Sequence, residues 1–423
     1  MYQKTTLDNG LRIVTANMPH TRSVTVALYY GVGSRYEPKR IGGVSHFIEH
    51  MVFKGTERRP LPQIISEAIE GVGGYLNAST GLETTNYYAK VPSKHFAMAL
   101  DVLTDMLDQP LFKPDDIEKE RQVIIEEINA TLDSPSDLVG ELFDLLLWGD
   151  QPVGWPVGGT RESVGDTTRA DLLGYLKSHY LPPNLVVSVA GDIQHDDVVE
   201  QVNRVFGDYP RGEQPPAFAP ATLPEAKPRV LLHSKETEQA NLVMGLPALS
   251  AFDPDRYKLD LLNAILGDGM SSRLFVELRE NMGIAYSVGS YTRKMADTGE
   301  FGIYAGADVE RAKESIVAAL AEMGKLKREP VSEDELNKVK EYRKGGLVLG
   351  LEDTAGVAMW GGGQELRYGK IYSVDEVTAE IDAVTAADIT EMANRYFVGD
   401  RLALAVVGPY NNAAEFQELL KIE

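Results

Sequence analysis

The chain has 423 residues, of which 43% are hydrophobic and 25% are charged, and this composition is typical of a globular protein too long for one hydrophobic core. The formal net charge of −21 argues against a nucleic-acid-binding protein, and the absence of cysteine excludes disulfides and thiolate metal ligands. No apolar run approaches the roughly 18 residues of a membrane span, and the first residues lack the pattern of a signal peptide, so we expect a cytoplasmic protein without a membrane span.

The first predicted elements are a strand over Ser23–Ser34 and a helix in HFIEHMVFKGT, residues 46–56. Two glycines precede this helix, and Ser45 is a possible N-cap. Lys54 and Gly55 mark its end, since a cation followed by glycine is typical of a helix C-terminus. The polar residues of the helix are surrounded by apolar ones, so they need a partner other than water.

His46 and His50 are four residues apart and therefore share one face of this helix. Two imidazoles so placed can chelate one zinc ion. Glu49 adjoins His50, and its carboxylate can reach a water on that metal without being a ligand. This is the H-x-x-E-H pattern of the inverzincins. The alternative is a helix whose histidines and glutamate are solvated or pair with each other.

A hairpin is predicted over Tyr75–Val91, and a long helix over 115–134 offers carboxylates for the third ligand that a catalytic zinc needs. Glu120 and Glu127 lie two turns apart on one face, whereas Glu126 points about 100° away from Glu127. One carboxylate could bind the metal while another holds the second nitrogen of a histidine ligand. Without a metal, such a glutamate-rich face is simply solvated.

The segment 212–228 is rich in proline and alanine and reads as a linker between an N-terminal domain, 1–211, and a C-terminal domain, 229–423. The two halves end alike. In each, a helix with a threonine N-cap leads into a buried strand that ends in glycine. The caps are Thr168 and Thr385, and the strands end at Gly191 and Gly408.

The second half repeats other features of the first. A strand is predicted over Asn241–Leu249 and a hairpin over Ala285–Ala307, and a long helix follows the hairpin in each half, over 94–108 and 310–326. The pattern predicts an α+β fold of two homologous α/β sandwich domains, with a mostly antiparallel sheet and helices on one face of each.

Several of these segments together resemble the pitrilysin and mitochondrial processing peptidase family of zinc peptidases. They are HFIEH, GGYLNASTGLETTNYY, ERQVIIEE and SSRLFVELRENMGIAYSVGSY. The resemblance covers essentially the whole chain and is to short-chain bacterial members. It implies one Zn²⁺ per chain, with His46 and His50 as ligands and Glu49 as the general base. The family's third ligand falls on Glu127 and its accompanying acidic residue on Glu120, and Glu126 remains the alternative.

The resemblance also implies where substrate binds. The strand with Leu76, Asn77 and Ala78 would pair with an extended peptide, and Arg279 and Tyr286 would match the family's arginine and tyrosine that hold substrate opposite the zinc. Because the chain carries both sets of residues, we expect a homodimer.

We expect a zinc-dependent endopeptidase that hydrolyses peptides or unfolded segments in a closed chamber, by means of a water activated by Glu49. Basic peptides are possible substrates, given the acidic charge. The alternatives are a non-catalytic assembly or partner subunit of the same fold, or a processing peptidase dedicated to one small precursor.

Overall fold

A computed structural model describes residues 2–213, 215–223 and 225–422. The chain divides into two compact units, each with one β-sheet. Unit 1 comprises Met1–Ile128, Trp155–Ala219 and Val348–Ser373, and unit 2 comprises Asn129–Gly154, Pro220–Leu347 and Val374–Glu423. One of the places where the chain passes from unit 1 to unit 2 lies between Ala219 and Pro220, within the segment 212–228 for which we expect a linker.

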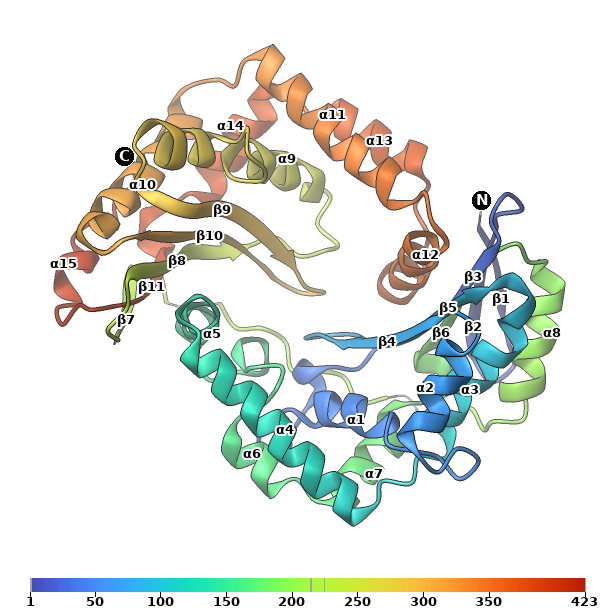
Figure 1. Cartoon of the computed structure of the whole chain (residues 1–423). Helices are drawn as coiled ribbons and strands as arrows, with labels where there is room; N and C mark the ends of the chain where they lie inside the picture. Colours follow the sequence, from blue (N-terminus) through green and yellow to red (C-terminus); the bar gives the residue numbers. More distant parts are fainter. Residues whose placement is uncertain (1, 214, 224, 423) are drawn as a thin grey trace. The chain divides into compact units, whose positions relative to one another are not determined.

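The sheet of unit 1 has six strands in the order β1-β2-β6-β3-β5-β4 (Figure 1). Only the β2–β6 pair is parallel, so the sheet is mostly antiparallel. Strands β1 and β4 form its two edges. The strands are β1 (Tyr2–Thr6), β2 (Arg12–Asn17), β3 (Ser23–Tyr30), β4 (Tyr75–Thr80), β5 (Thr85–Pro92) and β6 (Leu185–Gly191).

Seven helices contribute buried side chains to the core on one face of this sheet. From β3 the core takes Val24, Val26 and Leu28, which point to the same face because side chains alternate along a strand. The helices are α1 (Val44–Val52), α2 (Pro62–Glu70), α3 (Phe96–Asp108), α4 (Pro114–Asp133), α6 (Arg161–Asp166), α7 (Arg169–His179) and α8 (His195–Phe206).

The other face of the sheet of unit 1 is covered by α12 (Thr354–Tyr368), a helix from the second half of the chain (Figure 1). Strand β6 is buried along its whole length, so both faces of the sheet need cover. Close packing depends on glycine. A Cβ at Gly361 would lie 2.7 Å from a ring carbon of Tyr2, and one at Gly362 would lie 2.5 Å from a ring carbon of Tyr29.

Unit 2 has a five-stranded sheet in the order β7-β11-β8-β10-β9, with β7 parallel to β11 and the other pairs antiparallel. The strands are β7 (Arg229–Ser234), β8 (Gln239–Ala248), β9 (Ala285–Lys294), β10 (Gly299–Asp308) and β11 (Ala403–Gly408). Its helices are α9 (Arg256–Leu266), α10 (Ala312–Arg328), α11 (Glu333–Gly350), α13 (Val374–Ala383), α14 (Ala386–Tyr396) and α15 (Ala414–Gln417).

Helix α5 (Pro135–Trp148) comes from the first half of the chain and packs against β8 and β11 of unit 2. A largely buried network joins it to the sheet. The indole nitrogen of Trp148 donates to Glu300 at 3.0 Å, and Arg293 pairs with Glu300 at 2.9 Å and with Asp144 at 2.6 Å. Removing one member would leave a buried charge without its partner, so the network fixes where α5 lies.

The predicted α+β fold of two similar sandwiches is confirmed. The predicted strands and hairpins are found as β3, β8, β4–β5 and β9–β10. Thr168 and Thr385 cap α7 and α14 through capping boxes with Asp171 and Asp388. The structure adds one helix on the second face of each sheet, and this helix comes from the other half of the chain. Among the described residues, no helix combines the length and apolarity of a membrane span.

Candidate metal centre

Helix α1, which carries the H-x-x-E-H motif, begins on a buried carboxylate. The backbone amides of Gly43 and Ser45 donate to the two oxygens of Glu37 at 2.6 and 2.8 Å. Ser45 is therefore not the N-cap that the sequence suggested. Its buried hydroxyl lies inside the helix and donates to Tyr175 at 3.1 Å. The residue at the cap position is Gly43, whose φ of 90° suits glycine.

The apolar face of α1 is fully buried, and this burial fixes the direction of its polar residues. The buried side chains are Val44, Phe47, Ile48, Met51 and Val52. His46, Glu49 and His50 are partly exposed on the remaining side of the helix. The helix ends at Val52, two residues before Lys54.

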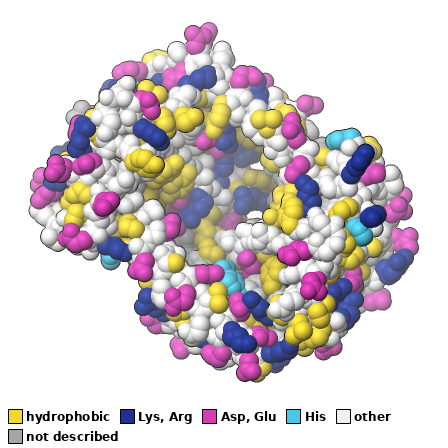
Figure 2. Space-filling model, in the orientation of Figure 1, with side chains coloured by type: hydrophobic (Ala, Val, Ile, Leu, Met, Phe, Trp, Pro, Cys, Tyr) yellow, Lys and Arg dark blue, Asp and Glu magenta, His cyan; other side chains and the backbone are white. Residues whose placement is uncertain are grey.

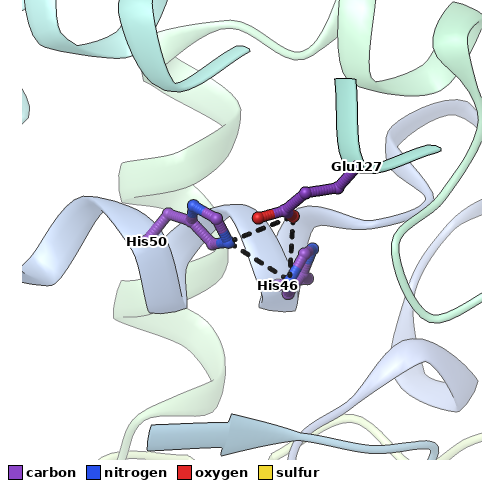
Figure 3. Close-up of side chains that lie close together, drawn as sticks. All are labelled: His46, His50 and Glu127. Carbon is purple, nitrogen blue, oxygen red and sulfur yellow. Dashed lines mark hydrogen bonds and ion pairs between the residues drawn. The ribbon is translucent and has the colours of Figure 1, made fainter. Parts of the chain in front are cut away.

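His46 and His50 of α1 and Glu127 of α4 each turn one potential ligand atom toward the others, and these atoms lie within 4.8 Å of one another (Figure 3). The two Nε2 atoms are 3.2 Å apart, and Oε2 of Glu127 lies 3.8 Å from that of His46 and 3.5 Å from that of His50. Ligands about 2.0–2.1 Å from a zinc ion in a tetrahedron are roughly 3.3 Å from one another. The three separations therefore fit one zinc ion.

Glu120 holds the other nitrogen of His50. Its Oε2 lies 3.2 Å from Nδ1 of His50, and its Oε1 lies 2.7 Å from Nζ of Lys54. A carboxylate in this place favours the proton on Nδ1 and leaves Nε2 with a free lone pair for a metal. Glu120 is buried. Glu126 and Glu127 are both exposed, and of these two only Glu127 belongs to the metal grouping of the described residues.

The pKa values of His46 and Glu49 suit a ligand and a base. Burial, followed by the charge of His50, lowers the pKa of His46 to about 4, so this imidazole is neutral near pH 7. Burial raises the pKa of Glu49 above its ordinary value, although the hydrogen bond from Thr80 and the charge of His50 oppose the rise. A raised pKa makes a carboxylate a better proton acceptor.

Three residues around the motif were not found from the sequence: Glu37, Lys54 and Thr80. Thr80, at the end of β4, donates its hydroxyl to Oε2 of Glu49. The sequence pattern indicates Lys54 only as part of a helix end. The hairpin that carries Thr80 was predicted, but no local pattern indicated that its end lies beside α1, because this contact depends on how the sheet and the helix pack.

The segment expected to bind peptide lies on an edge strand. Strand β4 pairs with β5 and, among the described residues, with no other strand. Leu76 and Ala78 pack against the core, while Asn77 is exposed and its side-chain oxygen accepts from the amide of Ala78 at 2.8 Å. Helix α1 contacts this strand, so the free edge and the metal grouping belong to one region of unit 1.

Arg279 and Tyr286 belong to unit 2 and lie close to each other. The guanidinium carbon of Arg279 is 5.6 Å from the ring centre of Tyr286, whose side chain is 72% exposed. Both line an open cavity of about 450 Å³, together with Glu238 and Asp308. Arg279 stands on the π-helical segment Phe275–Asn281, just before β9.

Comparison with known proteins identifies the family of the chain. Residues 12–161 match the insulinase family, peptidase family M16, and residues 166–342 match the domain described as the peptidase M16 inactive domain. A Streptomyces coelicolor protein named as an uncharacterized zinc protease is 40% identical over 96% of this chain and 89% of its own length. One of the same description from Bacillus subtilis is 38% identical over 97% of this chain and 99% of its own.

Solved structures share the fold. A protease from Helicobacter pylori has a TM-score of 0.91 at 24% identity, covering 97% of this chain and 99% of that one. A chain in the structure of Complex III2 from Candida albicans has a TM-score of 0.84 at 20% identity, covering 99% of both. The matches to both domains and the identity to relatives over nearly the whole length show that the chain belongs to the insulinase, or pitrilysin, family of peptidases, family M16.

Proposed function

We propose that the protein is a zinc-dependent endopeptidase. The observation that carries the proposal is the meeting of His46, His50 and Glu127 at separations suited to one zinc ion, with Glu49 beside them and outside the ligand set. The zinc protease names of relatives at 38–40% identity support the same metal and reaction class.

In the proposed reaction, His46, His50 and Glu127 would hold the zinc ion and Glu120 would orient His50. When bound, zinc supplies Lewis acidity toward water and the peptide carbonyl. Glu49 accepts the proton of the attacking water and then donates it to the nitrogen of the leaving amine. No residue of the chain needs to form a covalent bond with the substrate.

The free edge of β4 supports an extended peptide as substrate. A peptide would add as a further strand beside Leu76, Asn77 and Ala78, through main-chain hydrogen bonds that depend little on sequence. Its pairing would compete with the contact between Asn77 and the amide of Ala78. We further propose that Arg279 and Tyr286 contact substrate, and that the closed chamber and the homodimer implied by the family resemblance hold for this chain.

The net charge of −21 supports basic peptides as substrates, through an attraction that salt would screen. Acidic and basic side chains are interspersed over the face shown in Figure 2, so the attraction would come from the overall excess of acid rather than from one patch on this face.

The sequence leaves two other functions open. A non-catalytic subunit of the same fold does not need a metal centre, and a complete set of three ligand atoms and a base therefore favours the enzyme. A processing peptidase dedicated to one small precursor would use the same chemistry, and it differs only in its range of substrates.

Substitution of Glu49 tests the proposal. Because Glu49 is assigned as the base and not as a ligand, Glu49→Gln should lower peptide hydrolysis by about 10²–10⁴-fold while zinc stays near one equivalent per chain. His46→Ala should instead lose zinc. The measurements are turnover of a mixed peptide library, with and without a chelator, and metal content. Undiminished turnover by Glu49→Gln would exclude the base assignment, and a metal-loaded wild type that cleaves no peptide would favour the non-catalytic subunit.

A further inference from the structure

A hydrogen bond from one hydroxyl group joins Glu49 to the edge strand β4. Thr80 is the last residue of β4, and its hydroxyl donates to Oε2 of Glu49. The hydroxyl of Thr85, the residue that faces Thr80 across the hairpin, lies 3.3 Å from the Thr80 oxygen and 3.2 Å from the carbonyl oxygen of Val32. Thr85 is fully buried, so it is a fixed support behind Thr80.

We propose that Thr80 is a positioning residue for the base Glu49. This inference rests on the proposed function. A glutamate side chain has three rotatable bonds, and Glu49 is only partly buried, so packing alone leaves its carboxylate free to turn. The bond from Thr80 fixes Oε2. The remaining oxygen, Oε1, is then available for the proton of the attacking water.

The position of Thr80 in the hairpin explains how its hydroxyl can hold the carboxylate of Glu49 in place. Thr80 and Thr85 form the last registered pair of β4 and β5, and the turn is closed by a hydrogen bond from the amide of Gly81 to the carbonyl of Thr84 at 2.8 Å. The hydroxyl is thus held by a closed hairpin. The strand edge at Leu76–Ala78, which we propose as the peptide-binding site, belongs to the same hairpin. One hairpin would therefore align both the peptide and the base.

Kinetics of two Thr80 variants test the role of this residue in turnover. Thr80→Val keeps the shape of the side chain and removes the donor, and Thr80→Ser keeps the donor. We expect Thr80→Val to lower kcat about ten- to a hundredfold, the range for loss of one hydrogen bond to a charged group, with KM changed by less than about twofold and zinc content unchanged. Thr80→Ser should recover most of kcat.

The matched control is Thr5→Val. Thr5 lies on β1, the opposite edge strand of the same sheet, and its hydroxyl also bonds to a titratable side chain, Nε2 of His195, at 2.8 Å. This substitution should leave kcat unchanged. Wild-type kcat in zinc-loaded Thr80→Val, or a Thr80→Ser variant as slow as Thr80→Val, would overturn the proposal.

A second measurement does not depend on activity. In the metal-free protein, thermal unfolding midpoints of wild type, Thr80→Val, Glu49→Ala and the double variant form a double-mutant cycle. If Thr80 and Glu49 are hydrogen-bonded, the unfolding midpoint of the double variant should fall by less than the sum of the decreases in the two single variants. Additive decreases in the midpoint would show that Thr80 and Glu49 do not interact, and would overturn the proposal. A zinc-loaded wild type that cleaves no peptide while the cycle shows coupling would overturn the proposed function and leave the contact established.

Discussion

At the scale of single residues, the structure places two neighbouring glutamates, Glu126 and Glu127, differently with respect to the histidines. Both side chains are exposed, but the carboxylate of Glu127 lies 3.5 Å from Nε2 of His50, whereas Glu126 is outside the metal grouping. Adjacent positions of a helix differ by about 100° in direction, so both cannot face the histidines. Helical phase alone pairs Glu120 with Glu127, but it does not indicate whether Glu120 or Glu127 would be the metal ligand.

We expect Glu127→Gln to weaken zinc binding by more than about 100-fold, beyond the 10–100-fold typical of residues that only orient a ligand. The matched control, Glu126→Gln, should bind zinc like the wild type. Competition with a chromophoric chelator measures both affinities. Full zinc occupancy in Glu127→Gln, with a loss in Glu126→Gln, would reverse the assignment.

The residues that could be predicted from the sequence are those whose partners lie on the same helix or at a known spacing. His46, Glu49 and His50 share one turn of α1, and the structure brings Glu127 to the two histidines. Thr80 and Glu37 could not be predicted. Each touches α1 from another segment, and such contacts follow from the packing of the whole unit rather than from any local pattern.

At the scale of elements, α1 is held at its start by Glu37, which gives a pH-dependent stability. Burial raises the pKa of Glu37 to about 7, against the effect of the amide donors of Ser45 and Gly43. Its pKa is 4.5 in the unfolded reference, so the folded protein holds one more proton between about pH 4.5 and 7. Stability from this group is therefore complete below pH 4.5 and is lost as the pH rises to about 7.

Replacing Glu37 with glutamine should remove this dependence of stability on pH. We expect the wild type, relative to Glu37→Gln, to lose up to about 3 kcal/mol of unfolding free energy between pH 4.5 and 7, and nothing further above pH 7. Urea unfolding of the metal-free proteins across this range measures the difference. Glu57→Gln, at an exposed glutamate, is the control and should follow the wild type. A parallel pH dependence of wild type and Glu37→Gln would contradict the raised pKa.

The elements themselves were largely predictable, because their signals are local. The threonine caps of α7 and α14 and the alternation in the hairpins are read within a few residues. The placement of α5 and α12 was not predictable. An apolar helix face indicates burial but does not say against which sheet, and here each helix covers the sheet of the unit formed mainly by the other half of the chain.

At the scale of the whole molecule, the proposed catalytic and substrate-holding groups are divided between the two units. The metal grouping and Glu49 belong to unit 1, and Arg279 and Tyr286 belong to unit 2. In a homodimer, one active site could draw both sets from one chain or one set from each chain. The family resemblance implies a homodimer and leaves both arrangements open.

Mixing two inactive variants separates these arrangements. Glu49→Gln lacks the base, and the double variant Arg279→Ala/Tyr286→Phe lacks the substrate contacts. If each site uses both chains, a mixed dimer has one site with an intact Glu49 from one chain and an intact Arg279 and Tyr286 from the other. Random exchange at equal amounts makes half of the dimers mixed, so peptide cleavage should return to about a quarter of the wild-type rate. Absence of recovery after proven subunit exchange would place both sets within one chain, and a monomer that is fully active at assay concentration would exclude the dimer.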